Sequence, residues 1–286
     1  MRLVLTLLIA LTFIASPALA NQPEYINDQF LKRSIEAQAN KLVDANKTTE
    51  NKELQKQLNE RKRSDIAAPR PGTLTRNGED IYDKVDDGVL IIARMYLCGK
   101  CDKVHANCAS GFVVSKDGLA VTNHHVMQNT DEKTITFVAM TRDKRVVPIV
   151  EVLAGDEKND LSLVRLEGKD FSPVPIARKA EVGERVHAVT NPSGRFYTYS
   201  SGEISRFFVK PNRQGYKRSG SKCVTVTCNY GGGSSGGPIF NDLGQVVAVV
   251  SEAAVIPDKK IVHYDSVPYE SILNLFKDEK KQARGE

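Results

Sequence analysis

The chain has 286 residues, of which 41% are hydrophobic and 26% are charged, and its formal net charge at pH 7 is only +5. This small basic excess does not indicate a nucleic-acid partner. Beyond the first residues, no apolar segment approaches the roughly 20 residues that a membrane-spanning helix needs.

The first 20 residues, MRLVLTLLIALTFIASPALA, predict a cleaved secretory signal peptide. Arg2 precedes an apolar stretch that is too short to span a bilayer, and the small residues Ala18 and Ala20 suit signal peptidase. We therefore expect a secreted or periplasmic protein with no membrane span after cleavage. Without Arg2 its formal charge would be about +4.

Residues 21–66 predict a polar, helical, coiled-coil-like stalk. Positions 24–63 contain no glycine and only a few scattered large apolar residues, Phe30, Ile35, Leu42, Leu54 and Leu58. The segment is either a charged stalk without a function of its own, or a site of homo-oligomerisation or partner binding through those residues. The prolines and glycine of APRPGTLT then end any helix, so residues 67–77 predict a linker.

Residues 78–286 predict an all-β domain of about 200 residues. Lys116, Asp117 and Gly118 predict a hairpin turn between two strands, and only VPYESILNLFKDEKK has helical spacing. The expected architecture is one or two β-barrels followed by a C-terminal helix. The short apolar runs that predict strands are VLIIARMYL, GFVVS, LAVT, TITFVAM, RVVPIVEVL, LSLVRL, RVHAVT, CVTVTC and QVVAVVSEAAVI.

Five cysteines fit an oxidising compartment, but their odd number leaves at least one without an intrachain partner. We predict at least one disulfide and slightly favour Cys223 with Cys228. In an extended strand these Cα atoms would lie about 17 Å apart, so the pairing requires a turn between them.

The segment CGKCDKVHANC carries Cys98, Cys101, His105 and Cys108, four residue types that bind zinc, at close spacing. Export favours the oxidised form, so a disulfide or structural thiol is the preferred interpretation and a small zinc knuckle the alternative. We expect neither to be catalytic.

The segment GGGSSGGPIF, residues 231–240, lies between two predicted strands, which argues against a flexible linker. Glycines around a serine allow neighbouring backbone N–H groups to point at one spot, as an oxyanion requires. A serine nucleophile also needs a base and a group that orients the base.

Two adjacent histidines, in VTNHHVMQ, follow a predicted strand and offer such a base. They do not indicate a metal, since there is no HExxH motif and two histidines alone supply too few zinc ligands.

Three segments, TNHHV, NDLSLVRL and GSSGGP, occur in the order His, Asp, Ser, and VTNPSGRFYTYSSGEIS lies between the last two. In these segments the chain resembles the trypsin-like serine endopeptidases, most closely their bacterial HtrA branch, over roughly residues 80–275. The resemblance implies a double six-stranded β-barrel, protein or peptide substrates and no cofactor.

By this resemblance His125 is the general base, Asp160 orients it and Ser235 is the nucleophile. His124 matches a neighbour without a chemical part. Asp156 is the nearest rival to Asp160, but the apolar residues after Asp160 follow the family's pattern.

The resemblance also implies that the N–H groups of Gly233 and Ser235 form the oxyanion hole and that Ser251 supports the aspartate. Ser234 stands where trypsin-like zymogens carry an acidic residue that captures a new N-terminus, so activation by that ion pair is not expected. HtrA proteins usually carry a PDZ domain after the protease. The printed chain ends soon after its last predicted helix, so a branch without this domain is expected and PDZ-dependent regulation is not carried over.

In trypsin-like enzymes the position equivalent to Asn229 forms the floor of the substrate pocket, and an amide there offers no charge to a basic side chain. Ala253 stands where a wall glycine is common and would narrow the entrance. We therefore expect an exported serine endopeptidase that cuts after small or medium aliphatic residues. The main alternative is a catalytically weak binding or scaffold protein with an N-terminal interaction helix, and transfer to an acceptor other than water is a third.

Overall fold

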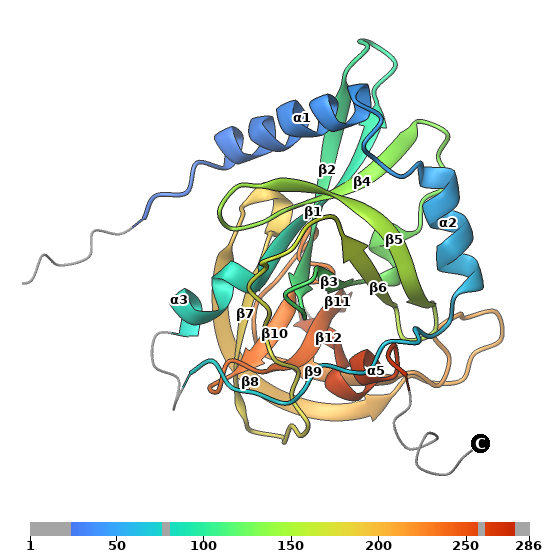
Figure 1. The fold of residues 1–286 in the computed structure, drawn as a ribbon. Helices are drawn as coiled ribbons and strands as arrows, with labels where there is room; N and C mark the ends of the chain where they lie inside the picture. Colours follow the sequence, from blue (N-terminus) through green and yellow to red (C-terminus); the bar gives the residue numbers. More distant parts are fainter. Residues whose placement is uncertain (1–23, 76–80, 257–260, 278–286) are drawn as a thin grey trace, which may run out of the picture.

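The computed structural model describes residues 24–75, 81–256 and 261–277, so the predicted signal peptide lies outside the described residues. Two closed antiparallel barrels of six strands each form most of the molecule (Figure 1). This architecture confirms the predicted double barrel. The first barrel has the order β1-β2-β3-β6-β5-β4, with β1 (Val89–Leu97), β2 (Val104–Val113), β3 (Leu119–Thr122), β4 (Thr134–Met140), β5 (Val146–Asp156) and β6 (Leu161–Leu166). The second has the order β10-β11-β12-β9-β8-β7, with β7 (Arg185–Thr190), β8 (Thr198–Val209), β9 (Lys222–Val226), β10 (Pro238–Asn241), β11 (Val246–Ile256) and β12 (Ile261–Pro268).

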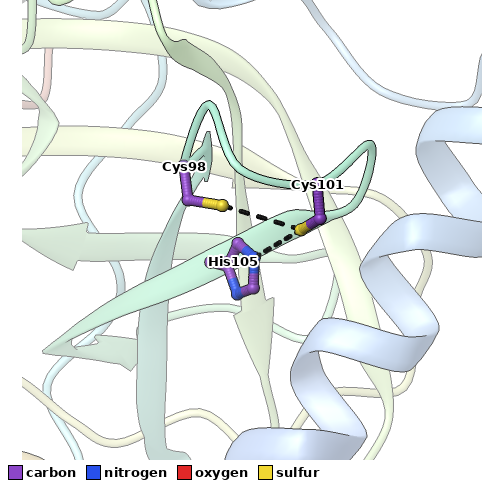
Figure 2. A group of neighbouring side chains, drawn as sticks. All are labelled: Cys98, Cys101 and His105. Carbon is purple, nitrogen blue, oxygen red and sulfur yellow. Dashed lines mark hydrogen bonds between the residues drawn. The ribbon is translucent and has the colours of Figure 1, made fainter.

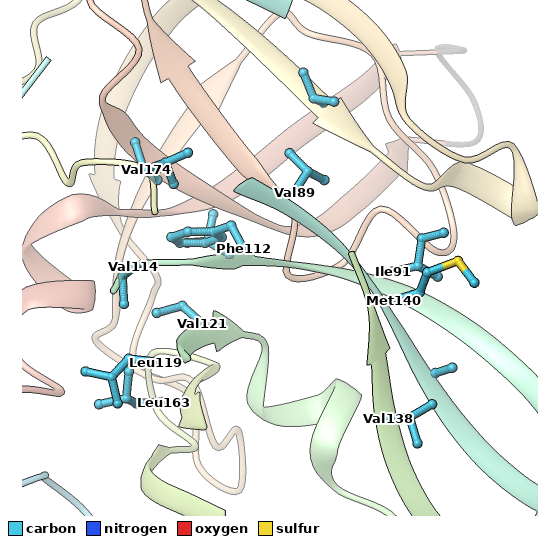
Figure 3. Packing of buried hydrophobic residues seen from close by; sticks show 14 of the residues in the cluster. Val89, Ile91, Phe112, Val114, Leu119, Val121, Val138, Met140, Leu163 and Val174 are labelled. Carbon is cyan, nitrogen blue, oxygen red and sulfur yellow. The ribbon is translucent and has the colours of Figure 1, made fainter. Parts of the chain in front are cut away.

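The apolar runs form strands that are buried on both faces, as β1 illustrates. Successive side chains of a strand point to opposite faces. Val89 and Ile91 accordingly pack in one apolar cluster, while Leu90 and Ile92 pack in another. Figure 3 shows part of the first cluster, where Val89 of β1 lies beside Phe112 of β2. That cluster continues into residues of the second barrel and thereby joins the two barrels.

The turn and the terminal helix predicted from the sequence are both present. Gly118 has a φ of +88°, which L side chains rarely adopt, and the β2–β3 hairpin closes with a hydrogen bond from Val114 N to Leu119 O of 2.8 Å. The helix α5 (Tyr269–Leu273) buries Ile272, and Phe276 beyond it is also buried. Before β1, a short helix α3 (Ile81–Val85) and a 3-10 turn η1 (Asp86–Gly88) lead into the first barrel.

Two N-terminal helices, α1 (Asp28–Asp44) and α2 (Asn51–Glu60), replace the predicted stalk. The expectation of helices agrees with the structure, but the expectation of a solvated stalk is wrong. Leu31, Ile35 and Ala39 recur every four residues and form one buried stripe along α1, and Leu54 and Leu58 do the same on α2. Both helices cover the first barrel (Figure 1). The apolar residues that could have served oligomerisation or partner binding are therefore mostly buried within the chain itself, although Phe30 is exposed.

The described part of the linker, residues 67–75, runs along the second barrel without helical structure. Gln245 Nε2 donates to Gly72 O at 2.7 Å, and Leu74 N donates to Leu243 O at 2.9 Å. These bonds attach the segment to the turn between β10 and β11. In the described residues no helix combines the length and apolarity needed to cross a membrane.

Candidate active site

His125 lies in a single helical turn, α4 (His124–Met127), directly after β3. Its Nδ1 is 2.9 Å from Asp160 Oδ2 and 3.0 Å from Oδ1, and its backbone N–H donates to Oδ1 at 3.0 Å. An ionised carboxylate can only accept, so the ring proton belongs on Nδ1 and Nε2 remains free as a base. The His125 side chain is 49% exposed while Asp160 is 7% exposed, so the base reaches solvent and its partner does not.

Asp160 stands just before β6 with a φ of +57°, an uncommon backbone conformation for a residue with a side chain. Its carbonyl oxygen accepts a 2.8 Å hydrogen bond from Asn123 Nδ2, and Ser251 Oγ donates to its Oδ2 at 2.7 Å. Burial raises the pKa of Asp160, but His125, Ser251 and the charge of Arg218 together hold this pKa below its ordinary value. The carboxylate therefore stays ionised and keeps His125 oriented.

Ser235 lies in a turn whose glycines are required by close contacts. A Cβ at Gly236, where φ is +83°, would clash with Thr122 Oγ1 and Ser110 O of the first barrel. A Cβ at Gly237 would lie 2.5 Å from Thr190 Cγ2. Ser110 N also donates to Ser235 O at 3.0 Å. The absence of side chains thus allows this turn of the second barrel to pack directly on the strands that carry His125.

The backbone N–H groups of Gly233 and Ser235 donate no hydrogen bond to any residue in the described part of the chain. Neighbouring carbonyls are held in place, since Ser193 N donates to Gly232 O at 2.6 Å and Ser110 Oγ donates to Gly233 O at 2.9 Å. In a trans peptide the N–H points opposite to the C=O. The contact at Gly232 therefore fixes the direction of the Gly233 N–H and keeps this donor available for an oxyanion.

A cavity of about 330 Å³ lies beside the paired residues, and both His125 and Ser235 line it. Its other walls include Ile92 and Arg94 of β1 and Cys108 of β2. Among the described residues no hydrogen bond joins the Ser235 hydroxyl to His125. Such contacts are often long without a substrate and tighten when one binds.

His124 is buried, and burial lowers its pKa. It does not line the cavity that His125 and Ser235 share. Ser234 is also fully buried, where its Oγ is 2.9 Å from Thr190 Oγ1. Position 234, which is acidic in trypsin-like zymogens, thus carries a neutral serine whose hydroxyl contacts that of Thr190.

Arg218 is a residue of the site that the sequence analysis missed. Its Nη1 donates to Ser251 Oγ at 2.7 Å and lies 3.7 Å from Asp160 Oδ2, with the side chain only 12% exposed. Nη1 is also 3.4 Å from Glu252 Oε2, and Glu252 in turn pairs with Lys210. Arg218 comes from the loop between β8 and β9, where no sequence motif signals an interaction with a carboxylate in the other barrel.

The two predicted pocket residues do not line the cavity beside Ser235. Asn229 is exposed and its carbonyl accepts from Ser200 Oγ at 2.8 Å, while Ala253 is an exposed residue of β11. Between them Tyr230 is buried, with its hydroxyl 3.0 Å from Ser266 Oγ and 3.4 Å from the carbonyl of Glu252.

The predicted disulfide between Cys223 and Cys228 is not formed, and all five cysteines are free thiols. Cys223 lies within the extended strand β9 and Cys228 beyond its end, so the turn needed to pair them is absent. Cys228 Sγ instead donates to Val186 O at 3.5 Å. Of the four residues of the alternative zinc set, Cys98, Cys101 and His105 lie together, whereas Cys108 lies apart on β2 at the cavity wall.

Comparisons with known proteins agree with the fold and the motifs. A family model described as a trypsin-like peptidase domain matches residues 109–249. A probable periplasmic serine endoprotease DegP-like of Hahella chejuensis is 34% identical over 145 residues, which are 50% of this chain and 29% of that protein. The serine endoprotease DegS of Haemophilus influenzae is 28% identical over 145 residues, which are 50% of this chain and 41% of that protein. The chain therefore matches well under half the length of these relatives.

Two solved structures share the fold. The Rv3671c protease from M. tuberculosis in its active form has a TM-score of 0.54 at 22% identity, covering 73% of this chain and 86% of that one. The HtrA-type protease AlgW with decapeptide has a TM-score of 0.55 at 16% identity, covering 68% of this chain and 64% of that one. Residues 109–249 thus match the trypsin-like peptidase domain, and the chain is similar in sequence to serine endoproteases named DegP-like and DegS.

Proposed function

We propose that this chain is an exported serine endopeptidase that hydrolyses peptide bonds through an acyl-enzyme intermediate. The observation that carries the proposal is the contact of His125 Nδ1 with the buried Asp160 carboxylate, at 2.9 Å, beside a cavity that Ser235 also lines. This arrangement leaves His125 Nε2 free on the side of the nucleophile. Export is supported by the amino-terminal sequence and by the matched relatives that are named as periplasmic.

In the first half-reaction Ser235 Oγ attacks the peptide carbonyl while His125 Nε2 takes its proton, so that a tetrahedral oxyanion forms. The N–H groups of Gly233 and Ser235 donate to this oxyanion. His125 then returns the proton to the leaving amine, the C–N bond breaks and an ester to Ser235 remains. In the second half-reaction water attacks this ester while His125 Nε2 takes a proton from the water. His125 then returns this proton to Ser235 Oγ, and the carboxylic acid product leaves.

Asp160 does not exchange a proton in this scheme. It holds the Nδ1 proton of His125 and stabilises the imidazolium that forms during attack. Its low pKa, which results from His125, Ser251 and Arg218 despite burial, suits that role because a protonated Asp160 would lose both functions.

A serine-directed fluorophosphonate probe tests the proposal on the mature protein. The probe should bond to Ser235 Oγ with loss of fluoride, and peptide sequencing should identify Ser235 as the labelled residue. Ser235→Ala should remove labelling and cleavage, and His125→Ala should lower kcat by about 10⁴-fold or more. The mass of the same preparation, expressed with residues 1–20, reports whether cleavage follows Ala20.

Two controls keep this test specific. Ser201→Ala changes an exposed serine of β8 and should leave labelling unchanged, and His124→Ala should stay within about tenfold of the unchanged protein. Circular dichroism must show that each variant is folded. A folded protein that neither takes the probe nor cleaves protein substrates would instead support the catalytically weak binding protein.

For substrates we propose cleavage after small or medium aliphatic residues such as Val, Ala or Leu. Neither Asn229 nor any described residue that lines the cavity beside Ser235 offers a negative charge, so burial of a substrate Arg or Lys near the nucleophile would be costly. Next to Asn229 the buried side chain of Tyr230 packs against the paired strands β11 and β12, with its hydroxyl at Glu252 O and Ser266 Oγ, which supports a shallow pocket.

Digestion of a peptide library, followed by mass spectrometry, tests this preference. We expect aliphatic residues on the acyl side to be cut about 10 to 200 times faster than poorly fitting ones. The Ser235→Ala protein gives the background. Cleavage mainly after Arg and Lys would contradict the preference while leaving the serine mechanism intact.

A further inference from the structure

The loop at the end of the β1–β2 hairpin, residues 98–103, brings two thiols and one imidazole together outside the active-site cavity (Figure 2). Cys98 Sγ is 3.6 Å from Cys101 Sγ, and Cys101 Sγ is 3.2 Å from His105 Nε2. The three atoms all lie within 4.8 Å of one another. From this juxtaposition we propose that Cys98, Cys101 and His105 bind one Zn²⁺ ion.

Two of the three distances between these atoms are close to the edges of a zinc tetrahedron, and the third is below 4.8 Å. With Zn–S bonds of about 2.3 Å and Zn–N bonds of about 2.0 Å, tetrahedral angles give S···S edges of about 3.8 Å and S···N edges of about 3.5 Å. The observed 3.6 Å and 3.2 Å are close to these lengths. The three ligands therefore need only small movements to accept the ion.

The turn that joins the cysteines supports the same arrangement. Gly99 has a φ of +73°, so the chain reverses within CGKC and both sulfurs face one side. The backbone N–H of Lys100 donates to Cys98 Sγ at 3.4 Å. A hydrogen bond of this kind stabilises a thiolate, which is the form that binds zinc.

The third ligand lies close to a carboxylate of the neighbouring helix. His105 Nε2 faces the sulfurs, and its Nδ1 lies 3.8 Å from Glu36 Oε1 on α1. A carboxylate on the far nitrogen orients a metal-bound histidine and makes it a better ligand. A disulfide between Cys98 and Cys101 would need neither His105 nor Glu36.

Glu36 is itself fixed, because α1 covers the free edge of β2. Ala106 N donates to Glu36 Oε1 at 3.2 Å, and the amide of Asn40 exchanges two 3.1 Å hydrogen bonds with the backbone of Val104. Zinc at this point would therefore link the hairpin tip to the strand that α1 holds. The same strand continues to Cys108 and the wall of the active-site cavity.

Two thiolates and an imidazole are a ligand set that favours zinc over magnesium or calcium, which prefer oxygen ligands. Cys101 is exposed, so water supplies the fourth ligand. Cys108 is not part of the site.

The experiment uses the full chain, purified from the export compartment without chelator or reductant. We expect about one zinc per chain by elemental analysis and five titratable thiols after the metal is released under denaturing conditions. After removal of zinc, titration with Zn²⁺ against a competing chelator should give one site. Co²⁺ in place of Zn²⁺ should show thiolate-to-metal charge-transfer bands and intense visible absorption. These bands are the signs of a four-coordinate site that includes thiolate ligands.

Variants separate this site from the other thiols. Cys98→Ser with Cys101→Ser should abolish binding, Cys108→Ser should keep one zinc, and Glu36→Gln should lower the affinity about tenfold or more. The amide oxygen introduced by Glu36→Gln can still accept from Ala106 N, so this variant keeps the helix contact and changes only the charge beside His105. A Cys98–Cys101 disulfide in the isolated protein, a reduced protein that binds no Zn²⁺, or binding unchanged in the double variant would each overturn the proposal.

Discussion

Arg218 places a buried positive charge behind the aspartate of the active site. Its Nη1 is 3.7 Å from Asp160 Oδ2 and donates to Ser251 Oγ, which in turn donates to the same carboxylate oxygen. The charges of Glu252 and Lys210 follow on its other side. Arg218 therefore acts on His125 through Ser251 and Asp160, as a positioning residue.

We expect Arg218→Met to shift the acid limb of the pH profile of kcat/KM upward by about one pH unit. Because the pKa of Asp160 is lower in the folded protein than in the unfolded chain, ionised Asp160 stabilises the fold above the unfolded-state pKa. This stabilisation is lost as the pH falls through the folded-state pKa of Asp160. Removal of the Arg218 charge raises the pKa of Asp160, so Asp160 is protonated, and ceases to orient His125, at higher pH. The measurement is kcat/KM against pH with a fluorogenic peptide.

Arg218→Lys retains a charge and should recover part of the profile, while Arg206→Met on the exposed side of β8 should leave it unchanged. A purely structural role for Arg218 predicts a different result. The rate would then fall by the same factor at every pH.

The ordered motifs predict His125, Asp160 and Ser235 as the catalytic residues because each lies in a local pattern whose spacing can be read along the chain. Arg218 has no such pattern. It meets Asp160 only because the loop after β8 folds back across Ser251 and Glu252 in the middle of β11. A contact of that kind depends on the packing of side chains that are far apart in the sequence, which no local motif records.

The helix α2 behaves as part of the first barrel rather than as an arm. Leu54 and Leu58 are fully buried, Gln57 Oε1 accepts from Val152 N at 2.8 Å, and Gly155 N donates to Arg61 O at 2.7 Å. These hydrogen bonds connect the C-terminal end of the helix to β5. The unfolding of α2 should therefore be cooperative with that of the barrel.

We predict that Leu58→Ala lowers the free energy of unfolding by about 2 to 5 kcal/mol, since it removes a fully buried side chain and leaves a cavity against β5. Denaturant unfolding, followed by a signal from the barrel, measures this change. Lys56→Ala, on the exposed face of the same helix, should change the free energy by less than about 0.5 kcal/mol. Equal stability of both variants would indicate that α2 does not contribute to the barrel.

At the scale of the whole molecule, the proposed active site lies where the two barrels meet. The first barrel supplies His125 and Asp160, and the second supplies Ser235 and Ser251. Asn191 spans the boundary, because its Nδ2 donates to Leu90 O at 3.0 Å while its Oδ1 accepts from Tyr197 N at 3.0 Å. Buried polar contacts of this kind hold the barrels in one relative position.

The sequence by itself determined most of the strands, the hairpin turn at Gly118, the terminal helix and the family motifs, because alternation, turn residues and motif spacing are local properties. None of the predicted runs covers β8, β10 or β12. Only the tertiary structure decided where α1 and α2 pack, since the same stripe of Leu31, Ile35 and Ala39 could have covered a partner or a barrel. It also decided which cysteines meet. Cys98 and Cys101 come together with His105 through the hairpin, while the extended β9 keeps Cys223 apart from Cys228. Short spacing along a chain permits such contacts, but strand direction and packing select among them.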